Sequence, residues 1–374
     1  MAFQRTWRTL AAATLTGSAW LPASAGAQGA GAEPTEEIIV TSSIVATPRR
    51  QLATAVSVID GPSIELRGYN DLADTLRTQP GIGVSNSGGP GKSTTLRIRG
   101  EAGFRTLLMI DGVKALDPSA PQVGPSFDSL LTTSDLRRVE VLRGPQGFIY
   151  GADAGGVVNV LTARGEGPIG GRVGIEYGAH DTRKLDAGLS GSGDRGDYFV
   201  SVTDFETDGF NAQTADTMLR DNDGADNTTL HAKLGWNAAE NLRLQLVARD
   251  VDASALFDSC PHPVTFATVH DCGVTTDQTT YKVSADLESG AFTHSFGASR
   301  IDIARDNISA GMSMFVTDGD IGRFEYTGAY RPSGSLTLVY GADLQSEAVD
   351  GDAALERDQD GYYVEYQGAF AERF

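Results

Sequence analysis

Acidic side chains near the middle of the chain have the residue types and spacing of a cation site. Asp221-Asn222-Asp223-Gly224 follows the pattern of a helix-loop-helix calcium loop for three residues. The match then ends, with Ala225 at the fifth place and Ala232 where the loop needs a bidentate glutamate. Carboxylates on neighbouring loops repel one another until a divalent cation neutralises them, and calcium accepts such flexible oxygen shells. The alternative is a set of acidic loops that face solvent.

A glycine-rich run earlier in the chain has some features of a phosphate-binding loop. Gly88-Gly89-Pro90-Gly91-Lys92-Ser93 ends as that motif does, but Asn86 stands where the motif needs its first glycine. The residues before it also lack a strand that leads into a helix. We therefore expect an exposed apical loop and no nucleotide site.

Histidines and cysteines are few in this sequence. The histidines show no metal-ligand spacing and no nucleophile partner, which argues against a catalytic site. Cys260 and Cys272 are the only cysteines, and in an oxidising compartment they are expected to form a disulfide, with two unpaired thiols as the alternative. The five histidines are treated as structural: His180, His231, His262, His270 and His294.

Charge and the N-terminal residues indicate an exported protein. A net charge of −19 argues against nucleic acid as a partner, because phosphate binding needs concentrated Lys and Arg. Residues 1–27 resemble a signal peptide, with Arg5 and Arg8 before an apolar stretch from Leu10 to Leu21 and small residues after it. No apolar stretch reaches the roughly 20 residues that a membrane-spanning helix needs.

Residues 28–50 are predicted to form a flexible tether, with one apolar run inside it. Glu37, Ile38, Ile39, Val40 and Thr41 include β-branched residues that favour an extended backbone. The run is therefore either an extended peptide offered to the sheet edge of a partner protein or an N-terminal tail with one apolar cluster.

Residues 51–165 are predicted to form a compact α/β unit. Strands are expected at 56–59, 95–99, 107–110, 138–142 and 157–161. One short helix is expected near Pro62 with Asp60 as its cap, and a second with Leu72 and Leu76 on one face and Asn70 as its cap. The unit is large enough to bury its own core.

From residue 166 to residue 374 apolar and polar residues alternate, as in Leu242-Arg243-Leu244-Gln245-Leu246. A soluble β-sandwich shows the same period of two. A membrane barrel is favoured because aromatic residues sit near strand ends, and because short turns alternate with long acidic loops, expected at 204–228, 250–280 and 305–322. On the order of ten strands are visible, whereas a barrel around such a unit needs about 22, so a truncated barrel is expected.

Several motifs between residues 96 and 160 resemble the plug domain of TonB-dependent receptors. They are Leu96-Arg97-Ile98-Arg99-Gly100, Leu107-Leu108-Met109-Ile110-Asp111-Gly112-Val113, Val139-Glu140-Val141-Leu142-Arg143-Gly144-Pro145, Tyr150-Gly151 and Gly155-Gly156-Val157-Val158-Asn159-Val160. The resemblance implies a transmembrane antiparallel β-barrel, partial here, with an N-terminal α/β plug domain inside it. It also implies a Gram-negative outer membrane, contact with its lipid, and no enzymatic activity.

The resemblance assigns roles to residues that precede the plug in the sequence and to residues within it. Glu37 to Thr41 resembles the TonB box, the peptide that a receptor offers to TonB and its inner-membrane energising complex. Arg99, Glu140 and Arg143 match charged residues that hold the plug against the barrel wall, with ordinary solvated strand ends as the alternative. Positions that match plug contacts to substrate in the cobalamin transporters of the family are Ser93, Thr95, Ala102, Ala120 and Pro121.

The acidic segment is also similar to the calcium-binding hairpin of those cobalamin transporters. On that similarity the calcium ligands would be Asn211, Asp221, Asp223, Asp258 and Asp277. Asn211 stands where the pattern has a carboxylate, and Leu219 where it has a polar ligand. Calcium would order the extracellular loops over a bound substrate.

The resemblance implies active import of a scarce, bulky nutrient. Cobalamin or another corrinoid is the first expectation, and a ferric siderophore is the alternative. A receptor that senses its ligand and signals inward is a different class, but such receptors carry an extra folded domain before the TonB box. A surface enzyme or adhesin would need a catalytic constellation or an external repeat.

Overall fold

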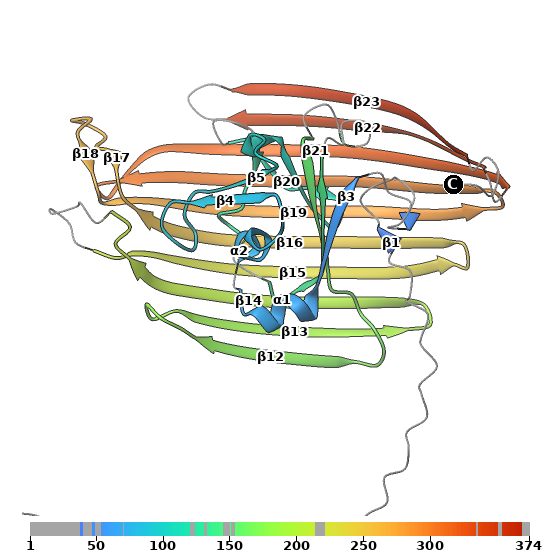
Figure 1. The fold of residues 1–374 in the computed structure, drawn as a ribbon, viewed down its shortest axis with the longest axis horizontal. Helices are drawn as coiled ribbons and strands as arrows, with labels where there is room; N and C mark the ends of the chain where they lie inside the picture. The colour runs from blue at the N-terminus through green and yellow to red at the C-terminus, as the bar shows by residue number, and fades with distance from the viewer. Residues whose placement is uncertain are drawn as a thin grey trace, which may run out of the picture. The chain divides into compact units, whose positions relative to one another are not determined.

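The computed structural model describes most of the chain, and residues 37–374 belong to one compact unit (Figure 1). The described residues are 38–39, 47–48, 54–69, 71–119, 124–130, 133–144, 150, 154–213, 221–333, 336–350 and 354–368. The predicted signal peptide lies outside them, as do Glu37, Val40, Thr41, Ala120 and Pro121. No helix in the described ranges is long and apolar enough to cross a membrane.

Residues 55–162 contain a five-stranded sheet in the order β3-β10-β11-β6-β7. Its strands are β3 (Ala55–Asp60), β10 (Leu136–Arg143), β11 (Gly156–Thr162), β6 (Thr106–Ile110) and β7 (Val113–Lys114). The β11–β6 pair is parallel and the other pairs are antiparallel. β-Branched and leucine side chains from the central strands, among them Val139, Val141 and Val158, are fully buried. This burial explains why apolar runs in the sequence locate the strands to within two residues.

Two short helices and two hairpins cover this sheet and its edges. They are α1 (Gly61–Arg67), α2 (Leu72–Arg77), the β4–β5 hairpin (Ile82–Asn86 with Thr94–Ile98) and the β8–β9 pair (Leu116–Asp117 with Gly124–Pro125). Asp60 caps α1 as expected, accepting a hydrogen bond from the Ser63 amide at 2.8 Å. The cap of α2 is Asp71, which corrects the expected Asn70, because the helix begins at Leu72 and the cap must directly precede it.

The Asp71 cap makes the stability of α2 depend on pH. Burial raises the pKa of the Asp71 carboxyl to about 6, against the opposing hydrogen bond from the Asp74 amide. Since folding disfavours the charged form, the stability that this group contributes declines as pH rises from about 4 to about 6. Asp71→Asn keeps the cap without the charge. The thermal midpoint of the variant minus that of the wild type should therefore be larger at pH 7 than at pH 4. An equal difference at both pH values in calorimetry would refute this cause.

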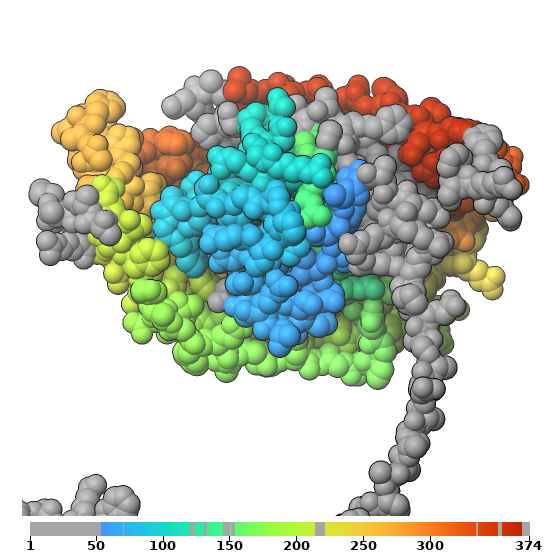
Figure 2. Space-filling view, viewed as in Figure 1, coloured from blue at the N-terminus to red at the C-terminus, as the bar shows by residue number. Residues whose placement is uncertain are grey.

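The second large element is a ten-stranded antiparallel sheet whose strands follow sequence order, apart from the small β17–β18 pair (Figure 1). The strands are β12 (Gly170–Tyr177), β13 (Arg183–Gly193), β14 (Gly196–Phe210), β15 (Asp223–Ala239), β16 (Leu242–Phe257), β19 (Cys272–Ser289), β20 (Phe292–Ser309), β21 (Met312–Ser333), β22 (Leu336–Asp350) and β23 (Leu355–Gly368). In Figure 2 the residues of the five-stranded unit gather in front of this sheet.

Each strand of the large sheet has one apolar face and one polar face. Leu234, Leu246, Val283, Ala298 and Phe324 lie in one continuous row across neighbouring strands and are exposed. Side chains of the opposite face are buried against the five-stranded unit, as Lys233 shows. A period of two with the apolar face exposed is the pattern of a barrel that meets lipid, whereas a soluble sandwich would bury that face.

Aromatic rings gather on the apolar face near the short turns. Phe292 stacks on Tyr330 with ring centroids 4.5 Å apart, and Phe296 lies 4.9 Å from Tyr326. The His294 ring stands among them and its Nδ1 lies 2.9 Å from the Tyr326 hydroxyl. Such a group of aromatic rings is typical of the level where a barrel meets lipid headgroups.

The long acidic loops expected from the sequence are largely wrong. The segment 305–322 is strand on both sides of a tight turn, where Ala310 and Gly311 both have positive φ. In 204–228 and 250–280, β14, β16 and β19 also continue well into the acidic residues. Acidic side chains on one face leave the backbone ladder intact, so polarity marks exposure to water and not the end of a strand.

A disulfide closes the connection between β16 and β19. Cys260 and Cys272 are bonded, and the enclosed segment folds into the small pair β17 (Cys260–Pro261) and β18 (Thr268–Val269). Ser309 Oγ donates to the Pro261 carbonyl at 2.8 Å. The closed loop is thereby fixed to the end of β20.

Candidate ligand pocket and plug contacts

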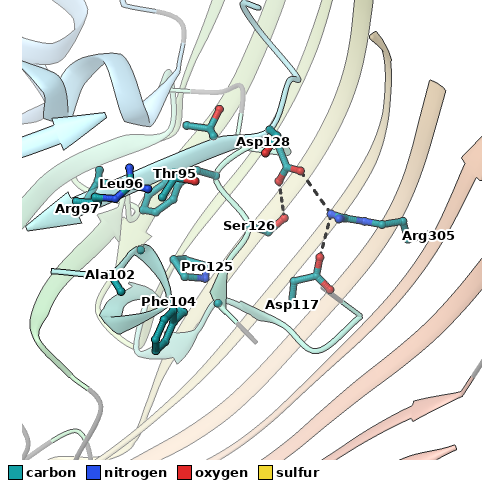
Figure 3. A pocket seen from close by; sticks show the side chains of 15 residues that line it. Thr95, Leu96, Arg97, Ala102, Phe104, Asp117, Pro125, Ser126, Asp128 and Arg305 are labelled. Atoms are coloured by element: carbon teal, nitrogen blue, oxygen red, sulfur yellow. Dashed lines mark hydrogen bonds and ion pairs between the residues drawn. The ribbon is translucent and has the colours of Figure 1, made fainter. Parts of the chain in front are cut away.

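A pocket of about 450 Å³ opens between the β4–β5 hairpin, the 3-10 helix η2 (Gly103–Arg105) and β9 (Figure 3). Its walls combine polar and aromatic groups, with Phe104 on one side and Asp128 on another. The lining residues are Ser93, Thr94, Thr95, Leu96, Arg97, Ala102, Gly103, Phe104, Asp117, Gly124, Pro125, Ser126, Phe127, Asp128 and Arg305.

Three of the five expected substrate contacts lie in this pocket. Ser93, Thr95 and Ala102 line it from β5 and from the start of η2. Ala120 and Pro121 lie outside the described residues, although Asp117 and Gly124 on either side of them also line the pocket. The sequence thus located one wall of the pocket.

Arg305 is a pocket residue that the sequence did not single out. Among the described lining residues it alone comes from the large sheet, where it lies on β20. Its Nη2 is 2.9 Å from Asp117 and 3.5 Å from Asp128, and Ser126 Oγ also donates to Asp128 at 2.8 Å. A strand more than a hundred residues away supplies this cation, so no local pattern could reveal it.

Further ion pairs connect the five-stranded unit to the large sheet. Lys233 Nζ lies 2.6 Å from Asp111 Oδ1, and Thr162 Oγ1 donates to Asp111 Oδ2 at 2.5 Å. Arg249 pairs with Asp135 at 3.1 Å. In each of these pairs the sheet supplies the cation and the smaller unit supplies the carboxylate.

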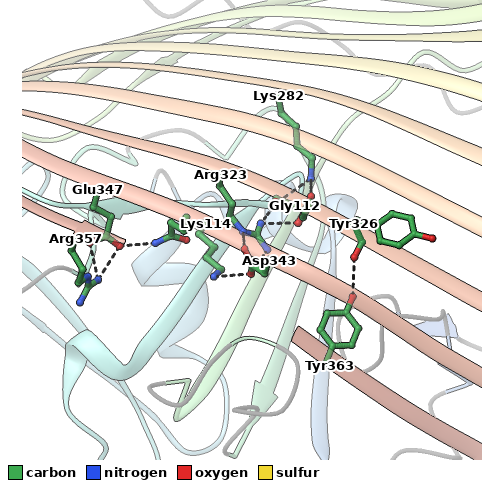
Figure 4. A network of polar contacts seen from close by, with 11 residues as sticks. Gly112, Lys114, Lys282, Arg323, Tyr326, Asp343, Glu347, Arg357 and Tyr363 are labelled. Atoms are coloured by element: carbon green, nitrogen blue, oxygen red, sulfur yellow. Dashed lines mark hydrogen bonds and ion pairs between the residues drawn. The ribbon is translucent and has the colours of Figure 1, made fainter. Parts of the chain in front are cut away.

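A second network joins the turn after β6 to later strands (Figure 4). Lys282 Nζ donates to the Gly112 carbonyl at 3.1 Å and to Glu325 at 2.6 Å. Arg323 makes two hydrogen bonds with Asp343, and Lys114 lies 3.1 Å from the same carboxylate. The Asp111-Gly112 turn is therefore held from two directions by buried charges.

Comparison with known proteins identifies the smaller unit. Residues 48–158 match the model of the TonB-dependent Receptor Plug Domain. That segment is a plug domain of the TonB-dependent receptor type, and the chain as a whole is similar to such receptors. The receptor is therefore an outer-membrane protein of the Gram-negative type, and its large sheet is part of a β-barrel around a plug domain.

Two curated relatives of the receptor are vitamin B12 transporters named BtuB. The protein from Vibrio vulnificus is 26% identical over 324 residues, which are 85% of this chain and 51% of the relative. The protein from Photobacterium profundum is 27% identical over 230 residues, 60% of this chain and 37% of the relative. The chain therefore spans about half the length of the Vibrio relative.

Solved structures with the same fold include siderophore receptors. The siderophore receptor PirA from Pseudomonas aeruginosa has a TM-score of 0.64 at 20% identity, covering 84% of this chain and 53% of that one. A ferric enterobactin receptor (PfeA) mutant from the same organism has a TM-score of 0.64 at 19% identity, covering 79% and 49%. At these sequence identities the structural similarity shows a shared fold and nothing more.

Two of the three residues expected to hold the plug against the barrel have described contacts within the plug. Arg143 donates to Ser57 Oγ at 2.7 Å and to the Pro80 carbonyl at 3.1 Å. Glu140 is fully buried and pairs with Arg138 at 2.7 Å, again inside the plug. Arg99 is exposed at the end of β5. Several of the plug–barrel ion pairs described above use carboxylates of the plug, such as Asp111 and Asp135.

Four of the five expected calcium ligands lie near the loop between β14 and β15. Asp223 Oδ2 accepts from the Ala212 amide at 2.8 Å, and Asp258 Oδ2 accepts from the Gln213 amide at 3.1 Å. Asn211, which adjoins Ala212, and Asp221 each have a buried Oδ1 with no hydrogen-bond donor in the described part of the chain. We call Asn211, Asp221, Asp223 and Asp258 the carboxylate hairpin.

The structure does not bring Asp277 to the carboxylate hairpin. Asp277 is exposed and pairs across the ladder with Asp252, six residues before Asp258. At roughly 3.4 Å per residue this places it about 20 Å away along the strand. Within the described residues no three acidic, histidine or cysteine side chains are arranged to hold a metal ion.

The apical loop is not exposed as expected. Lys92 is only 2% exposed, and its Nζ donates to the Gly224 carbonyl at 2.8 Å. Burial lowers the pKa of the Lys92 ammonium to about 8, while Asp223 acts in the opposite direction. The amine is thus still charged at neutral pH. The glycine run permits this close approach, which the sequence alone did not reveal.

Part of the expected TonB box forms a strand in the structure. β1 (Ile38–Ile39) pairs with β2 (Thr47–Pro48) in an antiparallel ladder. The extended backbone agrees with the β-branched composition of the run. Two residues in such a short ladder can be released at little cost.

Proposed function

We propose that the receptor imports a scarce, bulky nutrient across the outer membrane with energy delivered by TonB. The observation that carries the proposal is the pocket, in which Ser93, Thr95 and Ala102 converge with Arg305. The pocket lies where the plug meets the barrel, so a ligand bound there contacts both. Binding can then affect the plug–barrel contacts that transport must loosen.

Charge balance in the pocket supports a corrinoid as the ligand. Arg97 and Arg305 face Asp117 and Asp128, so the charged side chains of the lining sum to zero. Arg305 is engaged by both carboxylates, and Arg97 donates to Ser85 Oγ at 3.1 Å. A highly anionic iron chelate needs excess cations, whereas the neutral amides of a corrinoid suit paired charges. The vitamin B12 transporters among the relatives support the same choice.

A ferric siderophore is the second candidate, supported by the siderophore receptors among the solved structures. A ligand-sensing surface receptor is a third candidate, of a different class. It would bind ligand without importing it. Uptake and binding must therefore be measured separately.

Calcium at the carboxylate hairpin is part of the proposal. The buried Oδ1 atoms of Asn211 and Asp221 accept no hydrogen bond from the described residues, so they fit a cation that prefers oxygen ligands. Asp223 and Asp258 would supply negative charge. When bound, calcium would neutralise these groups and order the loop between β14 and β15. Asp277 is left out of this set because of its distance along the strand.

TonB is the proposed partner for the Glu37–Thr41 segment. The outer membrane has no ATP and no ion gradient of its own, so energy must arrive mechanically from a protein that spans the periplasm. An extended Ile38–Ile39 segment that leaves β2 can pair with a strand edge of that partner. Pulling on the tether would then act on β3, which follows it in the plug.

Ligand binding to purified receptor variants tests the pocket assignment. Arg305→Met should weaken binding of labelled cobalamin about tenfold or more, because a charge-assisted contact is lost and two carboxylates are left uncompensated. Arg300→Met is the matched control, since Arg300 lies on the same strand, is exposed and pairs with Asp302 on the outer face. Wild-type affinity in Arg305→Met would show that the ligand sits elsewhere. Tight binding of a ferric siderophore without cobalamin binding would remove only the corrinoid preference.

A further inference from the structure

One wall of the ligand pocket is apolar, in contrast to the charged wall formed by Arg305 and its two carboxylate partners (Figure 3). Phe104, Ala102 and Pro125 form this wall where η2 lies against β9, and we call it the apolar shelf. Phe104 is 40% exposed, whereas Phe127, which also lines the pocket, is 2% exposed and belongs to the plug core. The Phe104 ring is therefore available to a ligand and lies outside the core that stabilises the plug.

Phe104 is the central residue of η2, and backbone contacts hold this short helix from two sides. A side chain at Gly103 would overlap Thr95, so the glycine lets η2 pack directly on β5. The Gly155 amide donates to the Arg105 carbonyl at 2.9 Å, which joins the end of η2 to the segment before β11. The backbone that carries Phe104 is therefore fixed in place before a ligand arrives.

A cation of the plug lies over one face of the Phe104 ring. The central carbon of the Arg105 guanidinium is 5.9 Å from the ring centroid, and Arg105 also pairs with Glu101 at 3.6 Å. The negative face of an aromatic ring attracts a guanidinium in this position. Arg105 thus covers one face of the ring, and the exposed remainder of the ring is free to contact a ligand.

The apolar shelf and the charged wall suit a ligand portion that has two different surfaces. An aromatic ring packs best by offset or edge-to-face contact with another π-system, so the shelf favours a flat, conjugated surface. On the charged wall Asp117 and Asp128 already neutralise Arg305, so neutral hydrogen-bonding groups fit there. A pocket of about 450 Å³ has the size of a small-molecule site, so it holds one portion of a bulky nutrient.

We propose that Phe104 is a specificity-determining residue that stacks on a flat, conjugated portion of the imported nutrient. The receptor thereby selects ligands with a planar ring system and neutral polar groups at its edge. Ligands of similar size without such a ring system lose the contact with the shelf. This inference rests on the import proposed above, and it adds the chemical class of the ligand portion that the pocket receives.

Three labelled ligands test this inference on the purified receptor with its whole chain. Cobalamin and a ferric catecholate carry conjugated ring systems, and a linear ferric hydroxamate carries none. For the ring-bearing ligand that the wild type binds, Phe104→Ala should weaken binding about tenfold or more, and Phe104→Leu about threefold or more, because leucine is apolar but has no ring. Phe104→Tyr keeps the ring and should bind as the wild type does. Phe315→Ala is the matched control, since Phe315 is 48% exposed on β21 and does not line the pocket.

The outcomes separate this inference from the proposed import. Wild-type affinity in Phe104→Ala or in Phe104→Leu would overturn the stacking role, as would a wild-type receptor that prefers the ferric hydroxamate to both ring-bearing ligands. TonB-dependent uptake of the bound ligand, measured alongside, would in those cases still support import. A wild-type receptor that binds none of the three ligands would contradict both proposals. Equal thermal midpoints of the variants and the wild type show that weaker binding comes from the lost contact and not from misfolding.

Discussion

Replacing Ile39 with proline is expected to reduce energised uptake to the level of cells that lack TonB, while ligand binding stays unchanged. Proline removes the backbone N–H that a paired strand must donate and fixes φ, so it disrupts pairing with a partner strand. Ile39 lies on β1, far in sequence from the pocket residues. Accumulation of labelled ligand in whole cells and binding to isolated outer membranes measure the two properties separately.

Proline at Ser43, outside the apolar run, is the control for this variant. It alters the same tether but not the paired segment, so uptake should remain near wild type. Normal uptake by Ile39→Pro would show that Glu37–Thr41 is not the segment on which TonB acts. Loss of both binding and uptake would indicate misfolding, which the yield of folded protein in the membrane reveals.

The Asp111–Lys233 pair is expected to dominate the stability of the plug within the barrel. The side chains of Asp111 and Lys233 are 2% and 11% exposed, so Asp111→Asn leaves a buried ammonium without its counterion. Breaking such a pair costs about 3–5 kcal/mol. Asparagine tolerates the positive φ of 48° at this position, so the substitution removes charge with little backbone strain. Denaturant unfolding followed by tryptophan fluorescence measures the change.

A double-mutant cycle separates the pair from general damage. Asp111→Asn with Lys233→Met removes both charges, so the double variant should be more stable than the sum of the two single losses predicts. Asp250→Asn is the matched control, because Asp250 is exposed on the outer face and bonds only Thr279 there in the described structure. Additive losses in the cycle would mean that the pair contributes no coupling.

The plug was predictable because its signals are local. β-Branched runs such as Val139 to Leu142 form central strands that bury both faces, and Asp60 stands directly before a helix that contains Pro62. The alternation along β15 and β16 likewise follows from the pleat of a strand with one lipid-facing side. These features require only neighbours within a few residues.

Strand length in the barrel was not predictable from polarity. Asp320 lies in the segment 305–322 that resembled a loop, and it faces Asp302 across β20 and β21. Arg300 neutralises both carboxylates on the outer face, so the ladder continues beyond the apolar residues. Acidic composition therefore misplaced the end of the strands.

The residues that join plug and barrel were missed because their partners are distant in the chain. Arg305 reaches Asp117, and Lys92 reaches Gly224. Each pair is set by the register of long strands against the plug, which local composition does not encode. The family motif directed attention to Arg143 instead, whose described contacts stay within the plug.

Uptake of labelled cobalamin and of a labelled ferric siderophore, in cells that make this receptor with and without TonB, tests the central claim most directly. The account predicts that one of the two ligands, cobalamin first, accumulates above the diffusion background only when TonB is present. Accumulation that is equal with and without TonB, or accumulation of neither ligand despite binding at the cell surface, would contradict energised import through this plug.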